Sequence, residues 1–66
     1  MEKIIKTKDI VSFMKENALS KKQFCLKCRI SVSVLNKILN NQTNFYIIAL
    51  FRIARLMNRK VHTLFL

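Results

Sequence analysis

The sequence predicts an all-α fold, a compact domain built from five short helical segments. It contains neither glycine nor proline, the residues on which tight β-hairpin turns usually depend. Hydrophobic residues make up 52% of the chain, which is too many for a disordered basic tail and typical of a small globular core. Because 66 residues can build only one such core, we expect a single domain over residues 1–66, with residues 1–6 as a disordered arm.

The first two helices are predicted from their start signals and apolar spacing. A helix is expected from about Lys8 to Asn17, with Thr7 as its N-cap. Its predicted inward residues are Ile10, Val11, Phe13 and Met14. Ser20 is followed three residues later by Gln23, the spacing of a capping box, which predicts a second helix from Lys21 to Cys28. Its inward residues should be Phe24, Cys25 and Cys28.

Three further segments complete the predicted fold. Ser31 is a plausible N-cap for a helix from Val32 to Leu39, with Val34, Leu35, Ile38 and Leu39 inward. The polar run 40–44 should end this helix. A fourth helix is expected from Tyr46 to Met57, with an inward stripe of Ile47, Leu50, Ile53, Ala54 and Met57. The last segment, Lys60 to Leu66, should be a short helix or turn that closes the core through Val61, Leu64 and Phe65.

Five stretches of this sequence resemble one known family. They are residues 19–25 (LSKKQFC), 29–31 (RIS), 35–44 (LNKILNNQTN), 50–54 (LFRIA) and 64–65 (LF). In this order and without gaps they are similar to the lambda-repressor-like (Cro/XRE) family of five-helix DNA-binding domains, over about residues 7 to 66. The resemblance implies a helix-turn-helix formed by the second and third helices.

The chain departs from the family pattern at its turns. Where the family usually has glycine, this sequence has Arg29, Asn41 and Asn58, and where it has proline at the start of the fourth helix this sequence has Phe45. We therefore expect a positive φ at Asn41 and Asn58, because asparagine tolerates that conformation best among residues with a side chain. Arg29 should be strained by about 1 kcal/mol if the turn keeps a left-handed residue.

The charge of the chain is unevenly distributed. The net charge is +10, and all three acidic residues lie within residues 1–16. From Asn17 onward there are nine cations and no acid. This balance is typical of a protein that binds a polyanion, with nucleic acid as the first expectation and an acidic membrane surface as the second.

The resemblance implies that the third helix lies in the major groove of double-stranded DNA. Its outward residues would then read bases; they are Ser31, Val32, Ser33, Asn36 and Lys37. Lys37 can donate to guanine and Asn36 can bridge adenine. Phosphate contacts are expected from Lys21, Lys22, Asn40, Gln42, Thr43 and Asn44.

Catalysis and metal binding have little support in the sequence. Cys25 and Cys28 have the spacing of a metal or redox motif, but with His62 they make only three of the four ligands that structural zinc needs. We expect two buried, reduced thiols, a surface His62, and no metal or cofactor. The three carboxylates form no pair with a histidine, so we expect no enzyme activity.

The location and oligomeric state follow from apolar residues. No signal peptide precedes the first helix, and the apolar stretch Phe45 to Met57 is too short to span a bilayer, so we expect a cytoplasmic, nucleoid-associated protein. A chain of this length leaves no room for a separate oligomerisation domain. A homodimer on DNA is therefore expected through four apolar residues off the inward stripe, Ile48, Phe51, Leu56 and Leu66.

These observations favour a sequence-specific transcriptional regulator, a Cro-like repressor of bacterial or phage type. An alternative keeps the same scaffold but makes the protein an antitoxin or phage-encoded inhibitor that acts through a protein partner, since a fold alone does not define a function. A protein bound to an acidic membrane surface would explain the charge and the apolar content. It would not explain the two capping signals or the ungapped match to a DNA-binding pattern.

Overall fold

The chain forms four α-helices followed by one turn of 3-10 helix. The computed structural model describes residues 4–42 and 47–65. The helices are α1 (Thr7–Glu16), α2 (Lys21–Cys28), α3 (Val32–Leu39), α4 (Ile47–Leu56) and the 3-10 segment η1 (Val61–Leu64). Among these described residues there is no strand, only one antiparallel bridge between Ile5 and Phe65. The all-α class is confirmed, and the fifth segment is a single 3-10 turn rather than an α-helix.

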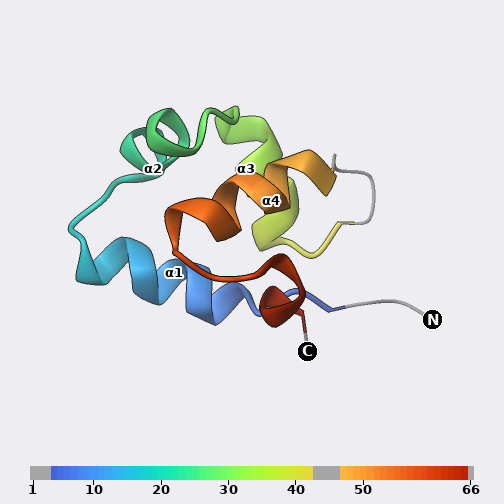
Figure 1. Cartoon of the computed structure of the whole chain (residues 1–66). Helices are drawn as coiled ribbons and strands as arrows, with labels where there is room; N and C mark the ends of the chain where they lie inside the picture. Colours follow the sequence, from blue (N-terminus) through green and yellow to red (C-terminus); the bar gives the residue numbers. More distant parts are fainter. Residues whose placement is uncertain (1–3, 43–46, 66) are drawn as a thin grey trace.

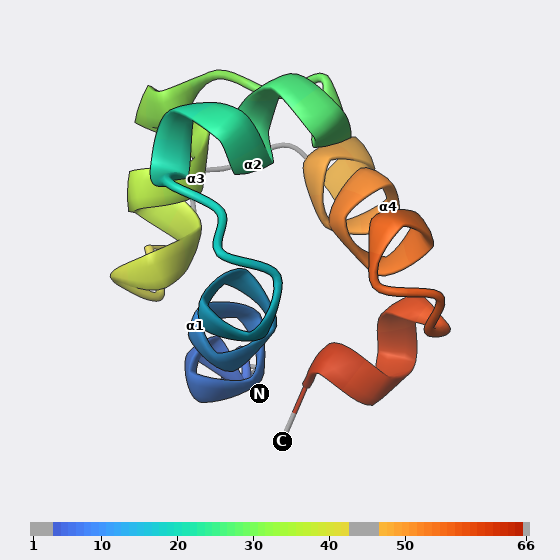
Figure 2. The same ribbon diagram turned by 90° about the vertical axis from the view of Figure 1, so that its left-hand side faces the viewer.

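The helices surround the core from four sides. Figure 2 shows α3 and α4 on opposite sides, with α2 crossing between them at one end and α1 at the other. In the same view α2 begins beside α3 and ends beside α4. Figure 1 shows η1 returning to α1, near the point where the chain begins. The two ends of α2 therefore belong to two different faces of the molecule.

The core takes residues from every helix. The fully buried side chains are Phe24, Ile10, Leu35, Ile38, Leu50, Ile53 and Leu64. Phe13 packs edge-on against Phe24, with ring centroids 6.2 Å apart, and so joins α1 to α2. Cys25 and Cys28 are free, buried thiols, as the sequence predicts. No charged or polar side chain is buried among the described residues.

The N-termini of α2 and α3 have the predicted caps. The Ser20 hydroxyl accepts a hydrogen bond from the Gln23 backbone N–H, and the Gln23 side chain accepts one from the Ser20 N–H, so both halves of the capping box are present. Ser31 caps α3 by accepting from the Val34 N–H at 3.1 Å. The bounds predicted for these two helices match the structure.

All four helices end in a left-handed residue although the chain has no glycine. The positive φ angles are 52° at Ala18, 61° at Arg29, 56° at Asn41 and 57° at Asn58. In each case the next residue donates to the carbonyl five positions earlier, as Ile30 does to Cys25 and Gln42 to Lys37. This is the hydrogen bond of a Schellman motif. The prediction for Asn41, Asn58 and Arg29 is confirmed, whereas Ala18 was not foreseen.

The N-terminal segment does not behave as a disordered arm over its described part. Ile5 is buried, and its backbone N–H donates to Asn41 Oδ1 at 2.7 Å. The Lys6 N–H donates to the Leu64 carbonyl at 2.7 Å. The expectation of a disordered arm is therefore wrong for Ile5 and Lys6, because their backbone groups pair with two distant parts of the chain; residues 1–3 lie outside the described residues.

The other differences between prediction and structure concern helix ends and residues predicted to point inward. Thr7 is the first residue of α1, and Lys6 occupies the N-cap position without a side-chain bond. Val11 and Ile47 are 36% and 51% exposed, so the prediction that they point inward is wrong. Ala49 is buried in α4 instead. The predicted start of the fourth helix, Tyr46, lies outside the described residues.

Candidate nucleic-acid interface

The start of α2 and the outer side of α3 are joined by a side-chain contact. Lys21 Nζ donates to Asn36 Oδ1 at 3.0 Å, across fifteen positions of sequence. Lys21 and its neighbour Lys22 are both exposed in the first turn of α2. The contact brings a cation from the predicted phosphate set onto a residue of the predicted base-reading set.

The base-reading residues are all accessible, to different degrees. Ser31, Val32 and Ser33 are exposed, whereas Asn36 and Lys37 are half-buried. The Ser31 oxygen accepts the capping bond, which leaves its hydroxyl proton and its second lone pair for a ligand. Asn36 Oδ1 likewise accepts from Lys21, which leaves the Asn36 NH₂ group and the second lone pair of Oδ1 for a ligand.

The phosphate-binding set is only partly described. Asn40 and Gln42 are exposed at the end of α3. Thr43 and Asn44 lie outside the described residues. Asn41, which lies between Asn40 and Gln42, has a structural role that the sequence does not predict. Its side chain accepts the bond from the Ile5 N–H, 36 positions away.

Arg59 is the one cation of the described residues in an ion pair. Its Nη1 lies 2.9 Å from Asp9 Oδ2, and it also donates to the Thr63 hydroxyl and carbonyl at 3.1 and 2.7 Å. This places Arg59 in the fold, between α1 and η1, rather than on a ligand-binding face. The other described cations of the acid-free stretch have no carboxylate within 4 Å.

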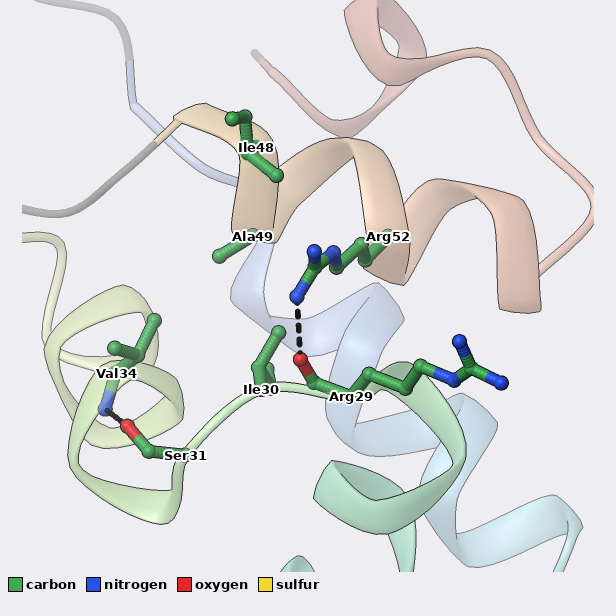
Figure 3. Close-up of a pocket in the computed structure, with 7 residues that line it drawn as sticks. All are labelled: Arg29, Ile30, Ser31, Val34, Ile48, Ala49 and Arg52. Carbon is green, nitrogen blue, oxygen red and sulfur yellow. Dashed lines mark hydrogen bonds between the residues drawn. The ribbon is translucent and has the colours of Figure 1, made fainter.

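A second group of cations lies at the opposite end of α2 and was missed in the sequence. Lys27, Arg29, Arg52 and Arg55 line a groove between the end of α2 and α4, together with Cys28 and Leu56. Arg52 Nη1 donates to the Arg29 carbonyl at 2.6 Å (Figure 3). In the sequence, the only sign of this groove is the spacing of Arg52 and Arg55, three positions apart on an apolar helix. That spacing does not predict that they lie near the Arg29 turn.

The two thiols are poorly suited to redox or metal chemistry. Burial raises the pKa of the Cys28 thiol to about 11, with a smaller contribution from Cys25. Burial also raises the pKa of Cys25, partly offset by the positive charge of Lys21. The reactive form of a cysteine is the thiolate, so both side chains act as small apolar residues at neutral pH. The described residues contain no cluster of three or more potential metal ligands.

The residues expected at a dimer interface differ in their exposure where the structure describes them. Ile48 and Phe51 are 59% and 53% exposed on α4. Leu56 is half-buried and packs against the core, so it is a core residue rather than part of an exposed patch. Leu66 lies outside the described residues. The exposed apolar surface of α4 is instead extended toward its first turn by Ile47.

These features define a small, mostly helical domain with a basic surface that carries no acid over α2, α3 and α4. No helix among the described residues has the length and apolar character needed to cross a membrane. Comparisons with protein-family models, with curated proteins and with solved structures gave no significant match.

Proposed function

We propose that this protein is a sequence-specific double-stranded DNA-binding regulator of transcription, a Cro-like repressor of bacterial or phage type. In this proposal α2 and α3 form a helix-turn-helix, and α3 enters the major groove. The protein acts without catalysis, by occupying a promoter in the cytoplasm. Its whole DNA-binding unit lies within residues 1–66.

The observation that carries the proposal is the contact between Lys21 and Asn36. It ties a cation at the start of one short helix to the outer side of the next, so that a residue proposed to bind phosphate lies beside one proposed to read bases. Lys22 and Ser33 are exposed on the same two helices. Because no carboxylate is present in this part of the sequence, the face is uniformly attractive to a polyanion.

The mechanism assigns separate roles to the two helices. Lys21 and Lys22 bind phosphates and fix the orientation of the protein on the duplex. Ser33, Asn36 and Lys37 contact base edges in the major groove. Lys21 occupies one lone pair of Asn36 Oδ1, so the Lys21–Asn36 pair combines ammonium and amide donors with one remaining acceptor, and we expect it to serve guanine as well as the adenine predicted from Asn36 alone.

Binding to a random-sequence duplex at several salt concentrations tests the proposal. Wild-type protein should bind with an affinity that falls steeply as salt rises, because each phosphate contact releases counterions. Lys21→Ala with Lys22→Ala should reduce the slope of log affinity against log salt by roughly 2. The control is Lys8→Ala with Lys15→Ala, which removes the same charge from exposed positions of α1 and should leave most of the slope intact.

Specificity is tested by selecting sites from a random DNA pool. Lys37→Ala should lose preference at one position of the selected site while keeping the others. A salt-independent affinity, or equal losses for the α1 and α2 pairs, would show that the proposed face does not bind DNA. An unchanged preference in Lys37→Ala would remove Lys37 from the reading residues.

A homodimer on DNA stays a prediction. Ile48 and Phe51 offer exposed apolar surface for it, but Arg52 and Arg55 lie on the same helix. The alternative function, action through a protein partner as an antitoxin or phage-encoded inhibitor, is favoured by the same surface, since large exposed apolar side chains have no role in phosphate binding.

A further inference from the structure

The groove at the end of α2 holds four cations that the proposed DNA interface does not use. Lys27 and Arg29 come from the end of α2 and its turn, and Arg52 and Arg55 come from α4. All four are exposed, and none has a carboxylate within 4 Å among the described residues. Arg52 is held in place by its bond to the Arg29 carbonyl, which uses one of its five N–H groups. The groove therefore presents four cationic donors for anionic groups, of which Arg52 is fixed by a hydrogen bond.

An apolar pocket adjoins this groove. Its walls are Ile30 and Val34 on one side and Ile48 and Ala49 on the other, with Ser31 at the rim. Arg29 and Arg52 line both cavities, so the two lie next to one another. Figure 3 shows the Arg29 side chain extending away from the apolar residues while Arg52 reaches toward the turn.

The size of the pocket limits what it can hold. Its volume is about 260 Å³, below the roughly 300–1,000 Å³ typical of sites for small-molecule ligands and cofactors. A single apolar side chain from a larger partner fits this volume better than a free ligand does. The combined site is thus a cationic groove with an apolar anchor point at one end.

Charge decides between the macromolecules that could cover such a surface. A second copy of this chain that met the groove with its own groove would bring four cations against four cations, with no acid from Asn17 onward to compensate them. A DNA backbone would satisfy the cations but would place nothing apolar in the pocket beside Ile48. A protein segment with carboxylates and a large apolar side chain satisfies both parts.

We propose that the groove between the end of α2 and α4 binds an acidic protein segment, whose carboxylates pair with Lys27, Arg52 and Arg55 and whose apolar side chain enters the pocket beside Ile48. Of the proposed reading residues only Ser31 lines this site, in the apolar pocket; Asn36 and Lys37 line neither cavity. Because α2 begins at α3 and ends at α4, the two sites lie at opposite ends of one helix (Figure 2).

The test uses a fluorescent synthetic peptide of about fifteen residues with glutamates and leucines at helical spacing. Anisotropy measures its affinity for the full chain. Two control peptides carry glutamine in place of glutamate, or serine in place of leucine. Only the peptide with both features should bind tightly, with affinity falling as salt rises.

Protein variants locate the binding site. Lys27→Glu with Arg55→Glu should lower the affinity for the acidic peptide by about tenfold or more. Lys8→Glu with Lys15→Glu makes the same charge change on α1 and should have a much smaller effect. Ile48→Ala should weaken binding several-fold, and its exposed position makes loss of folding a minor concern. Arg52 is left unchanged because it supports the turn.

Each result decides the question independently of the DNA proposal. Lys21→Ala with Lys22→Ala should bind the peptide as wild type does, even though its DNA affinity falls. No binding of the acidic peptide, or equal losses for the groove and α1 pairs, would overturn the proposal. If Lys27→Glu with Arg55→Glu lowers the affinity for duplex DNA and not for the peptide, the groove is a phosphate-binding site instead. Sedimentation of wild type as a dimer that Ile48→Ala dissociates would make it an interface between copies.

Discussion

At the scale of single residues, Arg29 carries local backbone strain that bears on a second helix. It has φ 61° and ψ 45°, a conformation that costs a residue with a side chain about 1–2 kcal/mol. The hydrogen bond from Arg52 Nη1 to the Arg29 carbonyl, 2.6 Å long, offsets part of this strain. An unfavourable backbone angle thus fixes the position of an arginine on another helix.

Replacing Arg29 with glycine should stabilise the protein. Glycine removes the left-handed penalty and keeps the carbonyl that Arg52 binds, while the greater freedom of the unfolded chain removes part of the gain, so we expect about 0.5–1 kcal/mol. Urea unfolding measures it. Asn58→Gly is the control and should gain less, because asparagine already tolerates φ 57°. A loss of stability in Arg29→Gly would mean that the arginine side chain itself supports the turn.

At the scale of elements, α2 connects the two ends of the molecule through a buried face of three residues. Phe24, Cys25 and Cys28 lie in the core, and the capping box and the Arg29 turn define where the helix starts and stops. Both boundaries were predictable, because each depends on hydrogen bonds within five residues of sequence. The elements that the helix contacts were not predictable in this way.

The buried thiol of α2 predicts a loss of stability at high pH. An unfolded cysteine has a pKa of about 8.5–9, whereas burial raises the pKa of Cys28 to about 11. Between these values the unfolded chain has lost the proton and the folded chain keeps it. The stabilisation is therefore complete below about pH 8.5 and is lost as pH rises toward 11, by about 1–2 kcal/mol.

Comparison with Cys28→Ala isolates this effect from the lysines, which titrate in the same range. The difference in unfolding free energy between wild type and Cys28→Ala should shrink as the pH rises from 8 to 11, measured by urea unfolding under reducing conditions. A difference that stays constant would mean that the folded thiol ionises as readily as the unfolded one.

At the scale of the whole molecule, the chain ends are tied together by a few long-range contacts. Arg59 joins α1 to η1 by its pair with Asp9 and its two bonds to Thr63. Ile5 bridges to Phe65 and donates to Asn41. These contacts close the four helices around one core with a radius of gyration of 10.7 Å.

Loss of the Arg59 network should weaken the whole fold. Arg59→Ala removes one partly exposed ion pair and two hydrogen bonds, and we expect it to cost about 1–2 kcal/mol in thermal or urea unfolding. Arg55→Ala is the matched control, since Arg55 lies on the surface of α4 and should change stability by less than about 0.5 kcal/mol. Equal effects of the two variants would show that the network contributes nothing beyond its charge.

The sequence by itself determined the helices and the caps of α2 and α3, because these depend on apolar spacing and on backbone groups finding partners a few residues away. The left-handed ends at Arg29, Asn41 and Asn58 followed from the family resemblance, and the one at Ala18 appeared only in the structure. Only the tertiary structure decided the pairs Lys21 with Asn36, Arg52 with Arg29, and Arg59 with Asp9. Their members lie 15, 23 and 50 positions apart, and packing of the helices around the core brings them together. For the same reason the sequence shows how many cations there are but not that Lys27, Arg29, Arg52 and Arg55 line one groove at the end of α2.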